Sequence, residues 1–421
     1  MVPAARWGIR PPAPSLPAPA DAAYAQSAQG GAEQQMMALM ASLGFALPMS
    51  WSLLTPVVVA AASVLANTHC ERVRMHARWL LSQAEDRLLD LSFDNDDASV
   101  LQSAVILSSG VNAGMCLLRS QAVLSASLTE RAHCMPPEAI VRLLKAVAMS
   151  GCNDDELARA LMRRVSQLVF ELSLPQLADV AFALAIYPHI QDEVLQELCF
   201  TQAMKAVITY NIHSQAVHPY CLFQLYLVHV ASSSSGRGAA LRSKLEATLP
   251  KAHVRRALST IRYGAEQTQA FAYQGRDRSS GSWHLAPASW RAQVWPALCA
   301  IAGPDATRIR ADTAHANRFR WSYVLPHMGF VLHCAPSSAY MFGPVANRTD
   351  DFGRLCLPAE HELQHSLRPS IHTIMQASCH DKSEIGIISF SAWANAGSVQ
   401  SQTDMVYLAL ADLAERKLQR I

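Results

Sequence analysis

The most specific short motif in the sequence is His361-Glu362-Leu-Gln-His365, an HExxH pattern. On a helix, two histidines four residues apart share one face and can bind a zinc ion, while the glutamate activates a bound water. Glu384 follows His365 by 19 residues, where some zinc peptidases place a third ligand. Pro369 lies one turn beyond His365 and would break the helix that must hold both ligands. We therefore expect an exposed polar segment without catalysis, with a zinc metallopeptidase as the alternative.

A second chemical feature is a basic segment, since residues 236–320 hold 14 Lys and Arg against 5 Asp and Glu. Its candidate phosphate contacts are Arg237, Arg242, Lys244, Lys251, Arg255, Arg256, Arg262, Arg276 and Arg278. Clustered cations neutralise phosphates, and the interleaved Tyr263, Phe271, Tyr273 and Trp283 can stack on unpaired bases. The alternatives are a solvated linker, or a segment that docks onto an acidic part of the same chain. We expect this segment to bind RNA.

The elements that precede the basic segment repeat every 38 residues. The apolar run that begins at Pro137 returns at Pro175, and the pair Asp154 and Leu157 returns as Asp192 and Leu195. Such a period is typical of stacked helical arrays, which provide extended binding surfaces. We expect helical hairpins over residues 99–249, with a proline in the first turn of the first helix. An acidic residue is expected at the start of the second helix of each hairpin.

Composition limits the class of protein. Of 421 residues, 51% are hydrophobic and 16% are charged, which excludes a disordered chain and indicates a surface largely covered by partners. Residues 33–235 carry 12 Lys and Arg against 18 Asp and Glu, so the array is acidic and poorly suited to hold phosphates. The ten cysteines include no CxxC pair, which favours buried free thiols in a reducing compartment. No nucleotide-binding or hydrolase motif occurs, and no cofactor is expected.

Two N-terminal regions come before the array. Residues 1–32 combine Arg6, Arg10, one acidic residue and six prolines, a composition typical of either an organelle transit peptide or a disordered tail. Residues 33–98 are expected to form an apolar helical capping region. No charged residue occurs between Gln34 and Cys70, so residues 47–66 could span a membrane; the alternative is a pair of buried helices, because Pro56 and several hydroxyl residues interrupt the stretch.

The pattern changes again near Arg320, after a basic connector over residues 250–319. Residues 329–334 and 384–390 are short β-like runs, and residues 359–376 and 402–420 have helical spacing. This order predicts a small α/β domain over residues 320–421. The predicted fold class is therefore mainly α, with a helical-repeat array followed by a small α/β domain.

The C-terminal residues resemble a known domain. The run Phe352-Gly-Arg354-Leu-Cys-Leu-Pro-Ala, the run from Ile385 to Trp393, and Leu408, Leu410 and Leu413 in the last helix are similar to a RAP domain. With the repeats, residues 99–420 resemble octotricopeptide-type and FAST-kinase-like organellar proteins, although the charged residue that this family often places before the Trp is missing.

The resemblance implies RNA binding in mitochondria or plastids. We accordingly expect a non-catalytic structural component of an organellar ribonucleoprotein in the mitochondrial matrix, with the mitochondrial ribosome as the first choice. Its partners would be ribosomal RNA and neighbouring proteins. The alternative is an RNA-free scaffold subunit of a mitochondrial membrane complex.

Overall fold

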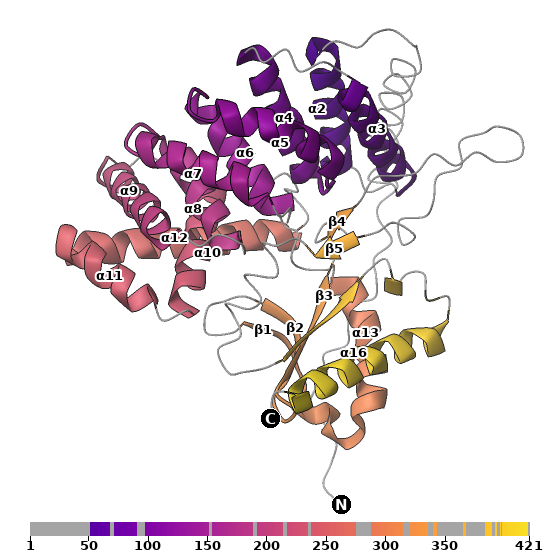
Figure 1. Cartoon of the computed structure of the whole chain (residues 1–421). Coiled ribbons are helices and arrows are strands. Elements are labelled where there is room, and N and C mark those ends of the chain that lie inside the picture. Colours follow the sequence, from indigo (N-terminus) through magenta and orange to yellow (C-terminus); the bar gives the residue numbers. More distant parts are fainter. Residues whose placement is uncertain are drawn as a thin grey trace, which may run out of the picture.

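The structure is a computed structural model. It describes residues 51–67, 71–90, 97–150, 154–187, 192–213, 217–234, 237–274, 288–314, 320–335, 340–342, 365–367, 384–389, 392–393, 396 and 398–419. These residues are mainly helical, with a small four-stranded sheet near the C-terminus. Figure 1 shows a curved body of helices next to a smaller part that holds this sheet. The mainly helical class with a small C-terminal sheet is confirmed.

The helical body contains helices α2–α12. They are α2 (Trp51–Asn67), α3 (Glu71–Asp90), α4 (Asp97–Ala113), α5 (Leu118–Arg131), α6 (Pro137–Ser150), α7 (Asp155–Leu168), α8 (Leu174–Ile186), α9 (Glu193–Ile212), α10 (Pro219–Ser234), α11 (Arg237–Thr248) and α12 (Lys251–Gln274). The even-numbered helices α2 to α12 pack side by side in one row. In a second row, α5 packs against both α3 and α7. Each of α2, α4, α6, α8 and α10 also contacts the helix that follows it, so one core runs through the whole body.

The repeated Asp-x-x-Leu element begins two of the helices in the body. The Asp154 carboxylate accepts a hydrogen bond from the backbone N–H of Leu157 at 3.2 Å, at the start of α7. Asp192 accepts from the N–H of Leu195 at 2.9 Å, at the start of α9. Both leucines are buried, so each cap also fixes a core residue. The predicted acidic starts are confirmed, and both aligned prolines lie in the first turns of α6 and α8.

Helix α2 covers most of the stretch that was considered as a membrane span. Its residues Leu54, Val58, Ala61 and Leu65 are buried, and the helix packs against α3 and α4. Within the described part of the chain, no helix combines the length and the apolar character that a membrane crossing requires.

The C-terminal part is built around a mixed sheet. Its strands are β1 (Arg310–Ala314), β2 (Arg320–Leu325), β3 (Phe330–Ala335) and β6 (Glu384–Ser389), in the order β1-β2-β3-β6. β1, β2 and β3 pair antiparallel, whereas β3 and β6 pair parallel. The β-like runs predicted at β3 and β6 are confirmed, and β1 and β2 were not predicted. Helices α13 (Ala288–Ala302) and α16 (Val399–Gln419) pack with the sheet. The short 3-10 helix η1 (Gly303–Arg308) packs against α13.

Strand β3 is buried on both of its faces. Phe330, Leu332 and Cys334 lie in the core that α13 and α16 complete, whereas Val331 and Ala335 belong to the core of the helical body. This alternation follows from the two-residue period of a strand. The sheet is therefore held between α13 and α16 on one side and the helical body on the other.

A second contact between the two parts is made by Phe342 in β4 (Tyr340–Phe342). Its backbone N–H donates to the Gly114 carbonyl at 2.8 Å, and its carbonyl accepts from the N–H of Cys116 at 2.9 Å. The guanidinium carbon of the buried Arg78, from α3, lies 3.8 Å from the centre of the Phe342 ring. Phe342 is thus fixed by backbone hydrogen bonds and by a cation–π contact.

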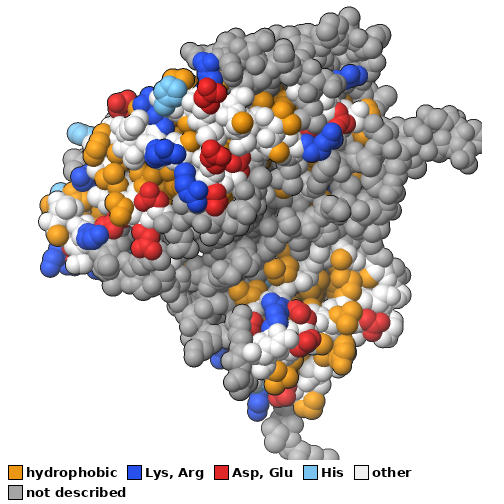
Figure 2. Space-filling model, in the orientation of Figure 1, with side chains coloured by type: hydrophobic (Ala, Val, Ile, Leu, Met, Phe, Trp, Pro, Cys, Tyr) orange, Lys and Arg blue, Asp and Glu red, His pale blue; other side chains and the backbone are white. Residues whose placement is uncertain are grey.

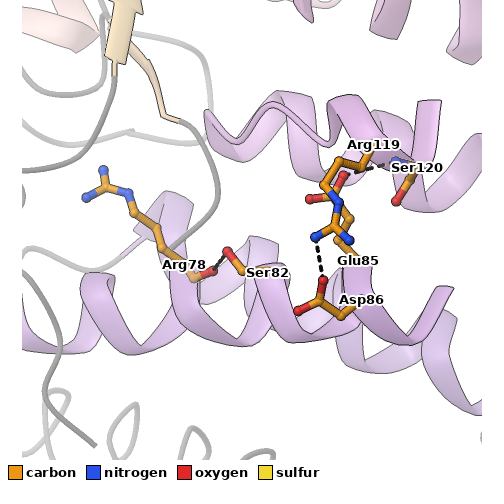
Figure 3. A network of polar contacts seen from close by, with 6 residues as sticks. All are labelled: Arg78, Ser82, Glu85, Asp86, Arg119 and Ser120. Atoms are coloured by element: carbon orange, nitrogen blue, oxygen red, sulfur yellow. Dashed lines mark hydrogen bonds and ion pairs between the residues drawn. The ribbon is translucent and has the colours of Figure 1, made fainter. Parts of the chain in front are cut away.

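Helix α3 also holds the N-terminus of α5 (Figure 3). The buried Glu85 carboxylate accepts the backbone N–H of Ser120 at 3.0 Å. Next to these two residues in the sequence, Asp86 pairs with Arg119 at 2.6 Å. Burial raises the pKa of Glu85, against the opposing effect of hydrogen bonds from the start of α5. Both contacts join the second-row helices α3 and α5.

Candidate nucleic-acid interface

Helix α12 carries predicted RNA-contacting residues on the side opposite its buried face. Val254, Ala257 and Ile261 are buried at helical spacing, and the helix packs chiefly against α10. The basic residues that are exposed on this helix are Lys251, Arg255, Arg256 and Arg262. Lys251, Arg255 and Arg256 form no ion pair with any other residue that the structure describes. Their charges are therefore available to a ligand.

An exposed aromatic ring accompanies these cations. Tyr263 directly follows Arg262, and 63% of its surface is accessible. The next residue, Gly264, packs so closely on Leu222 of α10 that a side chain there would overlap the leucine. The close approach at Gly264 holds this turn of α12 against the body, so the neighbouring Tyr263 is presented from a fixed backbone. Cations beside an exposed ring are the combination that binds single-stranded nucleic acid.

Helix α11 contributes less free charge than the sequence predicted. Arg242 pairs with Glu246 at 2.9 Å, and Lys244 reaches Glu197 on α9 at 2.8 Å. The hydrogen bond from Arg242 lowers the pKa of Glu246, and the charges of Lys251 and Arg255 lower it further. Figure 2 shows Lys and Arg side chains beside acidic ones at the end of the body where α11 lies. Each paired cation can bind a phosphate only in competition with its own carboxylate.

Three of the nine predicted contacts receive no side-chain description. Arg237 begins α11, but the position of its side chain is outside the described part, and Arg276 and Arg278 lie outside the described residues. The structure therefore places six predicted residues on two consecutive helices, α11 and α12. Of these, the four on α12 make up what we call the basic face, together with Tyr263.

A polar pocket that the sequence did not reveal lies between α4, α6 and α8. Its volume is about 210 Å³, and its lining consists of Ser108, Asn112, Arg142, Lys145, Ala146 and Asp179. The Nζ of Lys145 lies 2.5 Å from Oδ1 of Asp179, which also accepts the Gln224 amide of α10 at 2.6 Å. The pair thus links three neighbouring helices of the first row, α6, α8 and α10.

Lys145 stays protonated despite its burial. Burial alone lowers its pKa, but the surrounding Tyr220 hydroxyl and Asp179 carboxylate outweigh this and raise the pKa to about 12. The ammonium also lies 5.1 Å from the centre of the Tyr220 ring. Lys145 is consequently occupied by internal partners, and Arg142 at the rim pairs with Glu138 at 2.7 Å. We therefore assign this cluster a structural role within the helical body.

A sequence signal for this pair existed. Asp179 is the one charged residue of α8, whose other members are mostly buried and apolar, and Lys145 lies between buried residues of α6. An acid that is alone in an apolar helix, and a base flanked by buried residues on the neighbouring helix of the first row, require a partner when the helices pack.

The HExxH segment is not the helix that its spacing suggested. Residues His365–Leu367 form strand β5, which pairs antiparallel with β4 so that His365 lies opposite Phe342. The expected helix over residues 359–376 is therefore wrong at these positions, because cross-strand pairing with β4 is formed instead of a helical turn. His361 and Glu362 lie outside the described residues, and Glu384 is a buried residue at the start of β6. Among the described residues, no group of three potential metal ligands comes together.

The described cysteines are free thiols. Cys116, Cys199, Cys221 and Cys334 are buried, Cys299 is partly buried and Cys134 is exposed. Burial raises the pKa of Cys199 to about 12 and that of Cys221 to about 11. Buried thiols with raised pKa values are poor nucleophiles at neutral pH.

Comparison with known proteins gives no assignment. No protein-family model matches the chain, and no curated protein matches its sequence.

Proposed function

We propose that the protein binds single-stranded RNA, without catalysis, through the basic face of α12. The observation that carries this proposal is the exposure of Lys251, Arg255, Arg256 and Arg262 on one helix, next to the exposed ring of Tyr263. Arginine suits this role because its guanidinium can form two hydrogen bonds to a phosphate. The aromatic ring favours unpaired bases, whose faces are accessible for stacking.

We further propose that the chain is an organellar helical-repeat protein with a RAP-like C-terminal domain. The packing of the helices in rows and the two equivalent Asp caps are compatible with a stacked array of 38-residue units. In this proposal the protein is a structural component of a ribonucleoprotein in the mitochondrial matrix, first of all the mitochondrial ribosome. Contacts of this kind position RNA without reading its sequence.

The salt dependence of RNA binding tests the proposal. The full chain is titrated with a fluorescent single-stranded RNA of about 20 nucleotides at increasing salt concentration. Each phosphate contact adds about 0.7 to the slope of log affinity against log salt. The variant R255A/R256A/R262A is thus expected to bind more weakly and to lose about 2 from this slope.

The matched control is the variant R159A/R163A, which removes two exposed arginines of α7 outside the basic face. It should bind RNA as the unchanged protein does. The proposal is refuted if the unchanged protein does not bind RNA at low salt, or if the α12 variant binds as tightly as the control. The substitution Tyr263→Ala adds a test of strand type, because it should weaken binding of single-stranded RNA more than that of a duplex.

Association with the ribosome is tested separately in cells. The protein should migrate with mitochondrial ribosomal particles on a sucrose gradient and should leave those fractions after RNase treatment. Migration at the position of the free protein, with and without RNase, would contradict the ribosomal part of the proposal.

A further inference from the structure

Helix α16 is anchored to the sheet through one face. Val406, Leu410 and Leu413 are buried, and Gly386 in β6 lets the helix approach closely, since a Cβ there would lie 2.8 Å from Leu413 Cδ1. The basic residues of the last turns also take part in this anchoring. Arg416 donates to the Ile385 carbonyl at 3.2 Å.

Lys417 completes this anchoring. It donates to the Met328 carbonyl at 2.7 Å, and its ammonium lies 5.6 Å from the centre of the Phe330 ring. The positive charges of α16 are therefore engaged at its inner side and at Asp412, to which Arg416 also donates at 2.7 Å.

The outer face of α16 exposes large apolar side chains. Tyr407 is 59% exposed, Leu408 65% and Leu418 72%, although each is large enough to contribute to a core. In the view of Figure 1, α16 crosses the front of the C-terminal part, and Figure 2 shows hydrophobic side chains among charged ones of both signs over this part. Exposed apolar residues gathered on one helix indicate a surface that a partner covers.

The spacing on this face suits a partner helix. Asp404, Leu408, Ala411, Glu415 and Leu418 are exposed and follow one another at alternating steps of four and three residues. This is the spacing with which one helix packs along another. We call these five residues the outer seam of α16.

The charges of the outer seam define the partner. Asp404 accepts a hydrogen bond from the Gln400 amide at 2.9 Å, and Glu415 from the Gln419 amide at 3.4 Å, and neither carboxylate pairs with a cation among the described residues. A helix that covered them without a cation would bury two uncompensated charges, which is strongly unfavourable. RNA is excluded by repulsion between carboxylates and phosphates. A second copy of α16 brings the same acids and no cation on this face.

We propose that the outer seam of α16 binds an amphipathic helix of a partner protein, which places Lys or Arg opposite Asp404 and Glu415. The same helix places apolar side chains opposite Leu408, Ala411 and Leu418. This surface does not use the basic face of α12, so it can be tested independently of RNA binding.

Two synthetic peptides test the chemistry of the seam. Both are amphipathic helices of about three heptads with leucine along the contact face. One has lysine and the other has glutamate at the two positions opposite Asp404 and Glu415. The full chain should bind the lysine peptide at least about tenfold more tightly, because like charges oppose each other in the second complex.

A charge reversal provides the control. In the variant D404K/E415K, the preference should reverse in favour of the glutamate peptide, whereas E156K on α7 should leave the original preference intact. These positions are exposed, so the substitutions do not alter the buried face of α16. The proposal is overturned if the chain binds neither peptide, or if the variant keeps the preference of the unchanged protein.

A photo-crosslinking residue at position 408 then identifies the natural occupant in cells. The expected product joins position 408 to a segment of another protein that has basic and apolar residues at helical spacing. The same residue at position 194 of α9, where Val194 is 79% exposed, should not give this product. Crosslinking to RNA, to a second copy of the chain, or to nothing would overturn the proposal.

Discussion

The ion pair between Lys145 and Asp179 gives the sharpest test of how the helical body is held together. Only 14% of the Lys145 side chain and 27% of the Asp179 side chain are exposed. The substitution Asp179→Ala removes the carboxylate, and with it the acceptor of the Gln224 amide. It leaves the ammonium of Lys145 within the body without its counter-charge.

The magnitude follows from the pKa of Lys145, which the folded protein raises from 10.5 to about 12. Each tenfold change in proton affinity corresponds to about 1.4 kcal/mol, so the folded environment stabilises the charged form by about 2 kcal/mol. This stabilisation is complete below pH 10.5 and is lost as the pH rises through about 12. Asp179 supplies part of this attraction, together with Tyr220, and it is the partner that D179A removes. We therefore expect D179A to lose about 2 to 3 kcal/mol at pH 7.

The assay is urea unfolding at pH 7, with hydrogen exchange of α6 and α8 as a local measure. The double variant K145M/D179L, which replaces both charges by apolar groups, should recover most of the loss. The exposed pair of Glu138 and Arg142 on α6 is the matched control, and R142A should cost less than about 0.5 kcal/mol. A D179A protein as stable as R142A would refute this reasoning, as would a double variant no more stable than D179A.

Substitutions at three further residues test other contacts. D192A should destabilise α9 by about 1 kcal/mol, measured by its hydrogen exchange, whereas D192N should cost less because asparagine also caps; equal losses would contradict the cap. F342A should cost about 3 kcal/mol and speed exchange at Cys116, and unchanged exchange there would mean that Phe342 does not join the two parts. E85Q should gain stability relative to the unchanged protein as the pH rises from 4 to 7 in urea unfolding. Because burial raises the pKa of Glu85, the protonated carboxyl stabilises the folded state at low pH, and this contribution is lost as the pH rises. A difference in stability between E85Q and the unchanged protein that stays constant with pH would contradict the burial effect.

Local patterns predicted the helices and their starts well. Asp154 and Asp192 were expected at helix starts because an acidic cap followed by a leucine is a short-range signal, and both form the cap. The apolar runs of β3 and β6 were also recognised, since both strands are rich in β-branched or aromatic residues. These features depend on residues within a few positions of one another.

Features that depend on distant residues were missed. His365 was expected on a helix, yet it pairs across to β4, which lies more than 20 residues earlier in the chain. Strands β1 and β2 were not recognised: β1 is largely polar, and β2, although it holds aromatic and apolar residues, gains its regular form from pairing with β1 and β3. The charges of Lys145 and Asp179 among buried residues signal that each needs a partner, but the pocket between them depends on the packing of α6 against α8.

The distribution of free charge separates two surfaces. Arg242 and Lys244 of α11 are paired with Glu246 and Glu197, and the charge of Lys145 is compensated by Asp179. On α12, Lys251, Arg255 and Arg256 form no ion pair with a described residue, whereas α16 carries an acidic, apolar seam, so the two helices suit ligands of opposite chemistry. If these surfaces are independent, R255A/R256A/R262A should leave peptide binding unchanged, and D404K/E415K should leave RNA affinity unchanged within about 0.5 kcal/mol. A loss of both activities in either variant would show that one surface depends on the other.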